Sequence, residues 1–165
     1  MPVDKNLLAA EGYFELEMYE DALEELALAN KHPENGMEVL KRTLDIHIAR
    51  KQWNDAVDLA DALCSSDPGE PMFFIHLAYA HRELGQIEGA RCAILDGPES
   101  IERIGIFHYN LACYEALLGE HDTAVETLEM AFELDPDLWE TAQSDPDLTS
   151  IRDRIPAPPE EDVPF

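Results

Sequence analysis

Basic residues are scarce in this chain. Its 165 residues include 11 lysines and arginines against 36 aspartates and glutamates, so the formal net charge is −25 at pH 7. Nucleic acids and anionic membrane surfaces attract positively charged protein surfaces. We therefore expect neither a nucleic-acid partner nor a membrane partner. The acidity itself has three open explanations: solubility, adaptation to salt, and attraction of a basic partner.

Cysteines and long apolar segments are few as well. Cys64, Cys92 and Cys113 are odd in number and lack CxxC spacing, a pattern typical of reduced thiols in a cytoplasm. The longest apolar stretch, around residues 72–80, is too short to span a bilayer. The first residues lack the basic segment and the apolar core of a signal peptide. Together these features predict a cytoplasmic location.

Motifs of enzyme chemistry are missing too. The sequence has no glycine-rich phosphate loop, no zinc-ligand spacing and no nucleophile elbow. His76 and His81 are five residues apart, so they do not share a helix face as a pair of metal ligands would. We expect no enzymatic activity, no metal and no cofactor. His47 and His81 fall in one column with Tyr13 and Glu115, which we interpret as a polar seam between packed helices.

The stretch from Phe107 to Pro136 has the pattern of two amphipathic helices joined by a tight turn. Apolar residues recur at helical spacing in both halves. Gly119 is placed to end the first helix, because a left-handed cap favours a residue without a Cβ atom. Asp135 precedes a proline, and such a residue is driven out of the helical region, so the second helix is predicted to end there.

The same pattern repeats along the chain. Gly85 and Gly119 are 34 residues apart, and a column of alanines early in each predicted second helix keeps the same step: Ala22, Ala56, Ala90 and Ala124. A period of this length with a small residue at this place resembles the tetratricopeptide repeat, a helix–turn–helix unit. The resemblance covers roughly the first five-sixths of the chain.

This resemblance implies an all-α fold, namely a right-handed α-solenoid of four tetratricopeptide-like units followed by a short capping helix. The expected units are residues 3–36, 37–70, 71–104 and 105–138, with the cap at 137–154. Leu138 and Trp139 would start the cap, and Leu148 and Ile151 would cover the last apolar face. We expect residues 1–154 to form one domain and residues 155–165 to form an acidic, proline-rich tail.

The third unit departs from the pattern at Gly97 and Pro98. Glycine just past one helix and proline at the start of the next is a common arrangement. The second helix of this unit is therefore predicted to end about one turn early. The following helix is predicted to begin near Pro98 and to run to about Leu118.

In this family a strip along the first helix of each unit lines a concave groove. Apolar, aromatic and charged residues occupy the matching positions here: Leu7, Glu11, Phe14, Lys41, Arg42, Asp45, Ile75, Tyr79, Arg82, Tyr109, Asn110 and Cys113. Tyrosine and arginine are over-represented at binding hot spots. The rings favour apolar anchors in a ligand, and the basic residues Lys41, Arg42 and Arg82 favour an acidic residue beside them. Phe14 is equally well explained by packing against the next unit.

The resemblance thus implies a non-enzymatic protein-interaction module, an adaptor or assembly scaffold that binds a peptide or helix of a partner in this groove. Two alternatives stay open at this point. Small acidic tetratricopeptide chaperones, which hold an unfolded or secreted substrate protein, are similar in length and charge. Self-assembly into a homo-oligomer through an imperfect cap is the third option.

Overall fold

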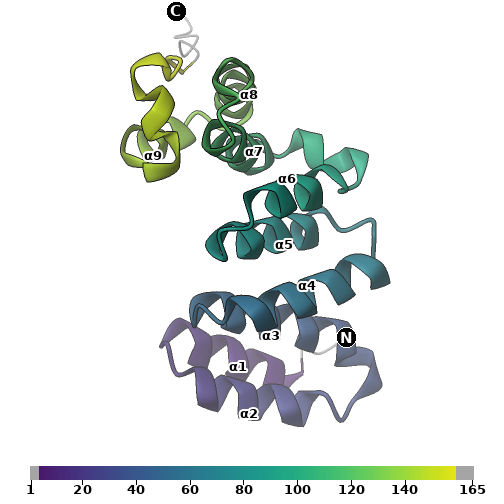
Figure 1. The fold of residues 1–165 in the computed structure, drawn as a ribbon. Coiled ribbons are helices and arrows are strands. Elements are labelled where there is room, and N and C mark those ends of the chain that lie inside the picture. Colours follow the sequence, from purple (N-terminus) through teal and green to yellow (C-terminus); the bar gives the residue numbers. More distant parts are fainter. Residues whose placement is uncertain (1–3, 159–165) are drawn as a thin grey trace, which may run out of the picture. The chain divides into compact units, whose positions relative to one another are not determined.

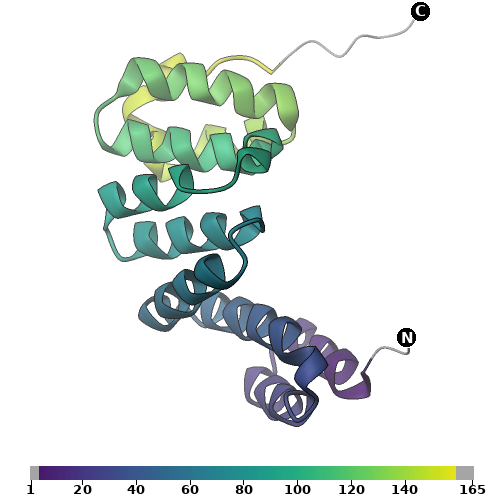
Figure 2. The ribbon, with the colours of Figure 1, turned by 90° about the vertical axis from the view of Figure 1, so that its right-hand side faces the viewer.

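The computed structural model describes residues 4–158, and within this range it contains helices and turns but no strand (Figure 1). The predicted all-α fold class is confirmed. Helices α1 and α2, α5 and α6, and α7 and α8 pack as pairs joined by short turns (Figure 2). The α-helices are α1 Lys5–Glu15, α2 Tyr19–Ala29, α3 Gly36–Ala49, α4 Trp53–Ser66, α5 Pro71–Glu83, α6 Ile87–Leu95, α7 Gly105–Leu117, α8 His121–Leu134 and α9 Leu138–Ser144. Within residues 4–158, the 3-10 helices are η1 Pro33–Asn35, η2 Glu99–Arg103 and η3 Pro146–Arg154.

The chain divides into two compact units, Met1–Leu63 and Cys64–Phe165, with the boundary inside α4. In the first unit, α1, α2 and α3 enclose one apolar cluster. Asp4 starts α1, because its carboxylate accepts a hydrogen bond from the backbone N–H of Asn6 at 2.8 Å and so caps the helix. The cluster consists of Leu7, Ala10, Ala22, Leu26, Ala29, Val39 and Ile46.

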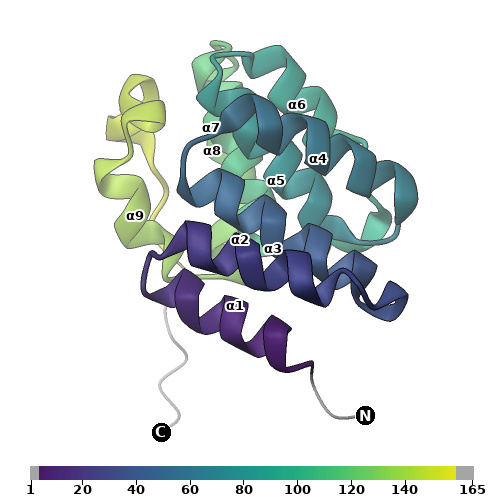
Figure 3. The same cartoon turned by 90° about the horizontal axis from the view of Figure 1, so that it is seen from below.

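The second unit contains α5 to α8 and the C-terminal cap, which is made of α9 and η3. Helix α9 lies beside α7 and α8 (Figure 3). Leu148 and Ile151 of η3 are buried, as predicted for residues that cover the last apolar face. The indole N–H of Trp139 donates to the carbonyl of Pro156 at 3.1 Å, which attaches the start of the predicted tail to α9. The remainder of that tail, residues 159–165, lies outside the described residues.

The turns inside the units share an unusual backbone conformation at one position. Gly85 and Gly119 have φ angles of 76° and 84°, which confirms the predicted left-handed caps. Glu17 and Lys51 occupy the same place in the first two turns, with φ angles of 58° and 57°. A residue with a Cβ atom is strained in this region of φ. The periodic turn therefore imposes the left-handed conformation even where glycine is absent.

Replacing Lys51 with glycine is expected to raise the free energy of unfolding by about 0.5–1 kcal/mol, because glycine adopts this conformation without the Cβ clash. Urea unfolding followed by the fluorescence of Trp53, two residues along the chain, measures the change. Gly85→Ala is the matched control in the second unit; followed at Trp139, it should change stability with the opposite sign. A Cβ atom at Gly85 would meet nothing within 4 Å, so its cost is purely conformational. Equal stability of Lys51→Gly and wild type would contradict the strain at this turn.

The start of α7 differs from the expectation. Helix α6 ends at Leu95, about one turn early as predicted, but the next segment is the short η2 and not a helix from Pro98. Ile104 then adopts an extended conformation (φ −109°, ψ 116°), and α7 begins at Gly105. A Cβ atom on Gly105 would lie 2.7 Å from that of Asp135, at the end of α8. The close approach of these two helix ends therefore sets the start of α7, and the local proline signal does not.

The two histidines of the proposed polar seam form hydrogen bonds with glutamines five residues later in the chain. Nδ1 of His47 lies 3.0 Å from Oε1 of Gln52, and Nδ1 of His81 lies 2.7 Å from Oε1 of Gln86. Both pairs join the end of a first helix to the turn that follows it. Glu115, at the corresponding place in α7, is buried, and its pKa is raised by that burial. The two histidines therefore hold the turns that follow α3 and α5, which accounts for them without a ligand.

Candidate functional site

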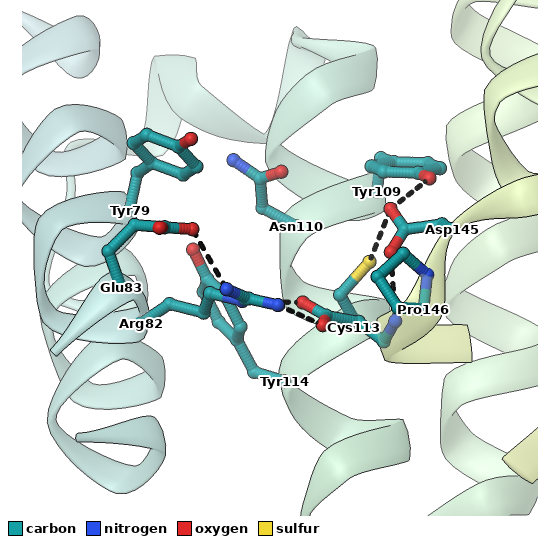
Figure 4. A pocket seen from close by; sticks show the side chains of 10 residues that line it. Tyr79, Arg82, Glu83, Tyr109, Asn110, Cys113, Tyr114, Asp145 and Pro146 are labelled. Atoms are coloured by element: carbon teal, nitrogen blue, oxygen red, sulfur yellow. Dashed lines mark hydrogen bonds and ion pairs between the residues drawn. The ribbon is translucent and has the colours of Figure 1, made fainter. Parts of the chain in front are cut away.

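A pocket of about 310 Å³ opens in the second unit between α5, α7 and the cap (Figure 4). Helix α5 contributes residues spaced three and four apart, which places them on one face. The segment between α9 and η3 closes the other side. Ten residues line this α5–α7 pocket: Tyr79, Arg82, Glu83, Tyr109, Asn110, Cys113, Tyr114, Asp145, Pro146 and Asp147.

Arg82 connects α5 to the cap. Its Nε donates to Oδ2 of Asp147 at 2.6 Å, and its Nη2 donates to the other oxygen of the same carboxylate. Its Nη1 donates to Oε1 of Glu83 at 2.8 Å. The hydrogen bond to Asp147 is the main reason why the pKa of the Arg82 guanidinium is raised. A two-pronged pair of this kind fixes both position and orientation, so it sets the width of the pocket.

Asp145 holds the cap against α7. The residue lies between α9 and η3 in an extended conformation, as expected before a proline. One carboxylate oxygen accepts from the backbone N–H of Asp147 at 2.9 Å, which starts η3. The other oxygen accepts from the hydroxyl of Tyr109 at 2.6 Å and lies 3.9 Å from Sγ of Cys113. The cap is therefore joined to α7 by its own carboxylate.

The thiol of Cys113 and the hydroxyl of Tyr109, two buried groups of the pocket, remain protonated at neutral pH. Burial raises the pKa of the Cys113 thiol, and the nearby carboxylates add to that effect. The pKa of Tyr109 is raised by burial first and then by the hydrogen bond to Asp145. Since the thiolate is the reactive form of cysteine, this environment does not favour a nucleophile.

Cys113, Asp145 and Asp147 form a group that could hold a metal ion by distance, because one ligand atom of each lies within 4.8 Å of the others. Their chemistry favours a different role. Asp145 already accepts from the Tyr109 hydroxyl, and Asp147 accepts twice from Arg82. A metal would also require the thiol to lose its proton. The three residues are better explained as the hydrogen-bonded junction between α7 and the cap.

The mouth and the interior of the pocket carry further polar side chains. The Tyr79 ring is 38% exposed. The side-chain amide of Asn110 projects between Tyr79 and Tyr109 (Figure 4). The ring of Tyr114 passes behind Arg82 in the view of Figure 4, and its buried hydroxyl has no hydrogen-bond partner among residues 4–158. A buried hydroxyl without a partner is costly, so it marks a place where a ligand or water is expected to bind.

The twelve residues predicted to line the groove lie in different environments in the structure. Tyr79, Arg82, Tyr109, Asn110 and Cys113 all line the α5–α7 pocket. Ile75, on α5, is buried in the core and is not a contact surface, contrary to the prediction. Its apolar side chain, which is 4% exposed, faces the packed side of the helix.

The other six predicted residues belong to the first unit. Leu7 is part of the apolar cluster, so its assignment to the groove is wrong for the same reason as that of Ile75. Phe14 is half-buried, packs against the cluster and lies 5.8 Å from the ring of Tyr19. Arg42 pairs with Glu38 at 2.9 Å and with Glu11 at 3.6 Å. The remaining two, Lys41 and Asp45, are half-buried and exposed, respectively.

Phe14, Arg42 and Asp45 line a small recess of about 30 Å³. That volume holds about one water molecule, which is too little for a side chain of a partner. This recess of the first unit is therefore much smaller than the α5–α7 pocket.

Sequence reasoning missed the cap side of the pocket. Asp145-Pro146-Asp147-Leu148 repeats Asp135-Pro136-Asp137-Leu138 ten residues earlier. The sequence predicts this segment as part of a cap. The repeated motif indicates in addition that the two aspartate pairs occupy equivalent places in their turns. In both copies the aspartate before the proline accepts from the backbone N–H two residues later.

No protein-family model matches the chain, and no curated protein is significantly similar to it in sequence. Solved structures do match. A crystal structure of MamA has a TM-score of 0.73 at 18% identity, covering 94% of this chain and 90% of that one. A second MamA crystal structure has a TM-score of 0.73 at 18% identity, covering 91% and 84%. A MamA RS-1 ArsTM double mutant has a TM-score of 0.68 at 19% identity, covering 86% and 80%.

The fold is tetratricopeptide-like. At these identities the likeness to MamA establishes the helical-repeat architecture, and one such fold hosts many functions. Among the described residues, no helix combines the length and the apolar composition that crossing a membrane requires. The function of this tetratricopeptide-like chain must therefore be inferred from its own pocket.

Proposed function

We propose that this chain is a non-enzymatic protein-interaction module that binds a peptide or helix of a partner protein at the α5–α7 pocket. The observation that carries the proposal is a recess of about 310 Å³ with the exposed Tyr79 ring and the Asn110 amide at its mouth. Tyrosines at recesses of this kind are typical binding hot spots. The tetratricopeptide-like fold adds support, because helical repeats present extended surfaces to partners.

The chemistry of the pocket favours binding over catalysis. The thiol of Cys113 and the hydroxyl of Tyr109 both have raised pKa values, so neither is activated as a nucleophile or a base at neutral pH. The carboxylates of Asp145 and Asp147 serve as anchors of the cap. These features support a role without a cofactor, in which the pocket is a rigid receptor.

Replacing Tyr79 with alanine is expected to weaken partner binding by more than about 1 kcal/mol, because the exposed ring would lose its contact area on the ligand. The partner is first captured from an extract of the native cell with the wild-type chain. Its affinity is then measured by calorimetry for purified wild type and variant.

Met130→Ala is the matched control. Met130 lies on α8 outside the pocket and is 42% exposed, close to the 38% of Tyr79. It should bind the partner as tightly as wild type. If Tyr79→Ala also binds as tightly as wild type, the α5–α7 pocket is the wrong surface.

A chaperone for an unfolded or secreted protein is the second candidate. The observation that favours it is the turn between α1 and α2, where Leu16 is 69% exposed and Met18 is 42% exposed. Exposed apolar side chains of this size suit an unfolded segment. Suppression of aggregation of an unrelated denatured protein, lost in Leu16→Ser, would distinguish this activity from pocket binding. The cytoplasmic location and self-association into a homo-oligomer stay predictions.

A further inference from the structure

We propose that the α5–α7 pocket receives a single cationic side chain, a lysine or an arginine, of the partner peptide. This inference rests on the proposed peptide binding and specifies the chemistry of the anchor. It replaces the acidic anchor that the sequence favoured beside Arg82.

The balance of charge in the pocket is the first reason. The carboxylates of Glu83, Asp145 and Asp147 line it together with one guanidinium, that of Arg82. Two negative charges are therefore in excess, and they lie in a recess where solvent screens them less than on an open surface. The net charge of −25 on the whole chain acts in the same direction, since it steers basic partners toward the protein.

The second reason is that Arg82 is not available to an anion. Its Nε and Nη2 both donate to Asp147, and its Nη1 donates to Glu83. A carboxylate entering the pocket would meet an arginine that is already neutralised, with two acidic side chains attached to it. An acidic residue of a partner is therefore repelled at this place.

The third reason is a buried polar group without a partner. The hydroxyl of Tyr114 can accept a hydrogen bond and has no partner within residues 4–158, and the amide oxygen of Asn110, which lines the same pocket, is a second possible acceptor. Tyr114 is only 2% exposed, so its hydroxyl cannot be satisfied by bulk water. A cationic head group brings several N–H donors and no acceptor, which suits such a site.

Size and shape agree with one side chain. The volume of about 310 Å³ lies at the low end of the roughly 300–1,000 Å³ found for pockets that hold small ligands. Tyr79 stands at the mouth with Glu83 below it, and Asn110 projects between Tyr79 and Tyr109 (Figure 4). A cation that enters between them would lie against the face of the Tyr79 ring, which attracts positive charge. Its N–H groups would reach the carboxylate of Glu83.

The test uses N-acetyl-arginine amide as the probe and N-acetyl-citrulline amide as its neutral counterpart of nearly equal shape. Both are titrated into the ¹⁵N-labelled full chain, and the side-chain amide signals of Asn110 are followed by NMR. We expect the arginine probe to shift these signals in a saturable way. The citrulline probe should bind about three- to fivefold more weakly or not at all, since that is the contribution of one partly exposed ion pair. Added salt should weaken the arginine probe alone.

Two substitutions test whether the carboxylate of Glu83 binds the arginine probe. Glu83→Gln should weaken the arginine probe about three- to fivefold. Glu126→Gln, which removes one negative charge from an exposed position on α8, should leave it unchanged. The Tyr79→Ala variant tests the same site and leaves the ion pairs of Arg82 in place. The amide spectra show directly whether each variant is folded.

Equal binding of the two probes, or a response of Asn110 to N-acetyl-aspartate amide instead, would overturn the charge preference. So would the absence of any shift at Asn110 with all three probes. In each of these cases the cationic anchor is wrong, but peptide binding at the α5–α7 pocket is still supported if Tyr79→Ala weakens partner binding. If Tyr79→Ala has no effect on partner binding, both proposals are wrong.

Discussion

Replacing Leu148 with alanine is expected to lower the free energy of unfolding of the second unit by about 2–5 kcal/mol. Leu148 lies on η3 and is 0% exposed. Its side chain helps to pack η3 against α7 and α8, so the substitution leaves a cavity there. The loss is large for one residue, because η3 is a short 3-10 segment whose only other buried side chain is that of Ile151.

Fluorescence separates the two units in this measurement. The chain has two tryptophans, Trp53 before the unit boundary and Trp139 on α9. In a Trp53→Phe background, urea unfolding followed at Trp139 reports on the second unit. Leu134→Ala is the matched control, since Leu134 is 48% exposed on α8 and should change stability by no more than about 0.5 kcal/mol. A loss of the same size in both variants would show that η3 does not cover a core.

The same substitution bears on the binding site. Asp145 and Asp147 are carried by the segment that Leu148 anchors, and they form one wall of the α5–α7 pocket. Loosening this segment frees Arg82 from Asp147 and Tyr109 from Asp145. The cap is therefore both the end of the hydrophobic core and part of the candidate receptor.

Replacing Ala124 with leucine is expected to destabilise the second unit by about 1–3 kcal/mol, because three added carbon atoms must fit where α7 and α8 pack. Ala124 is 0% exposed, as are the other members of the alanine column. The measurement is again urea unfolding followed at Trp139. Ala27→Leu, at an exposed position of α2, makes the same change of volume and should cost little when the unfolding of the first unit is followed at Trp53 in a Trp139→Phe background. An unchanged unfolding midpoint for Ala124→Leu would mean that the small residue is not needed at this crossing.

Several features of this protein follow from the sequence by itself. The 34-residue step of the alanines, the glycines at the turns and the aspartate–proline stops each act through neighbouring residues. A left-handed turn, the exclusion of a pre-proline residue from the helix and an apolar helical face are local preferences, so they can be recognised without the fold. For that reason the left-handed turn at Gly119, the early end of α6 and the buried residues of the cap agree with the predictions.

Other features were decided by contacts between distant residues. Pro98 could have opened a helix, but Gly105 begins α7 because that helix end packs closely against Asp135. Glu17 and Lys51 take a left-handed conformation that their own side chains disfavour, since the packing of the helices on either side of the turn requires it.

The α5–α7 pocket likewise has features that follow from the sequence and features that only the fold determines. Helical spacing placed Tyr79 and Arg82 on one face of α5, and the 34-residue step related Ile75 to Tyr109 on α7. No spacing could show that Arg82 meets Asp147, 65 residues away in the chain. That contact removes Arg82 from the basic group predicted to attract an acidic residue, because an arginine already bound to carboxylates no longer attracts an acidic ligand. Periodicity thus determined which residues share a helix face, whereas the charge of the pocket depends on the return of the cap onto α5 and α7, which only the tertiary structure decides.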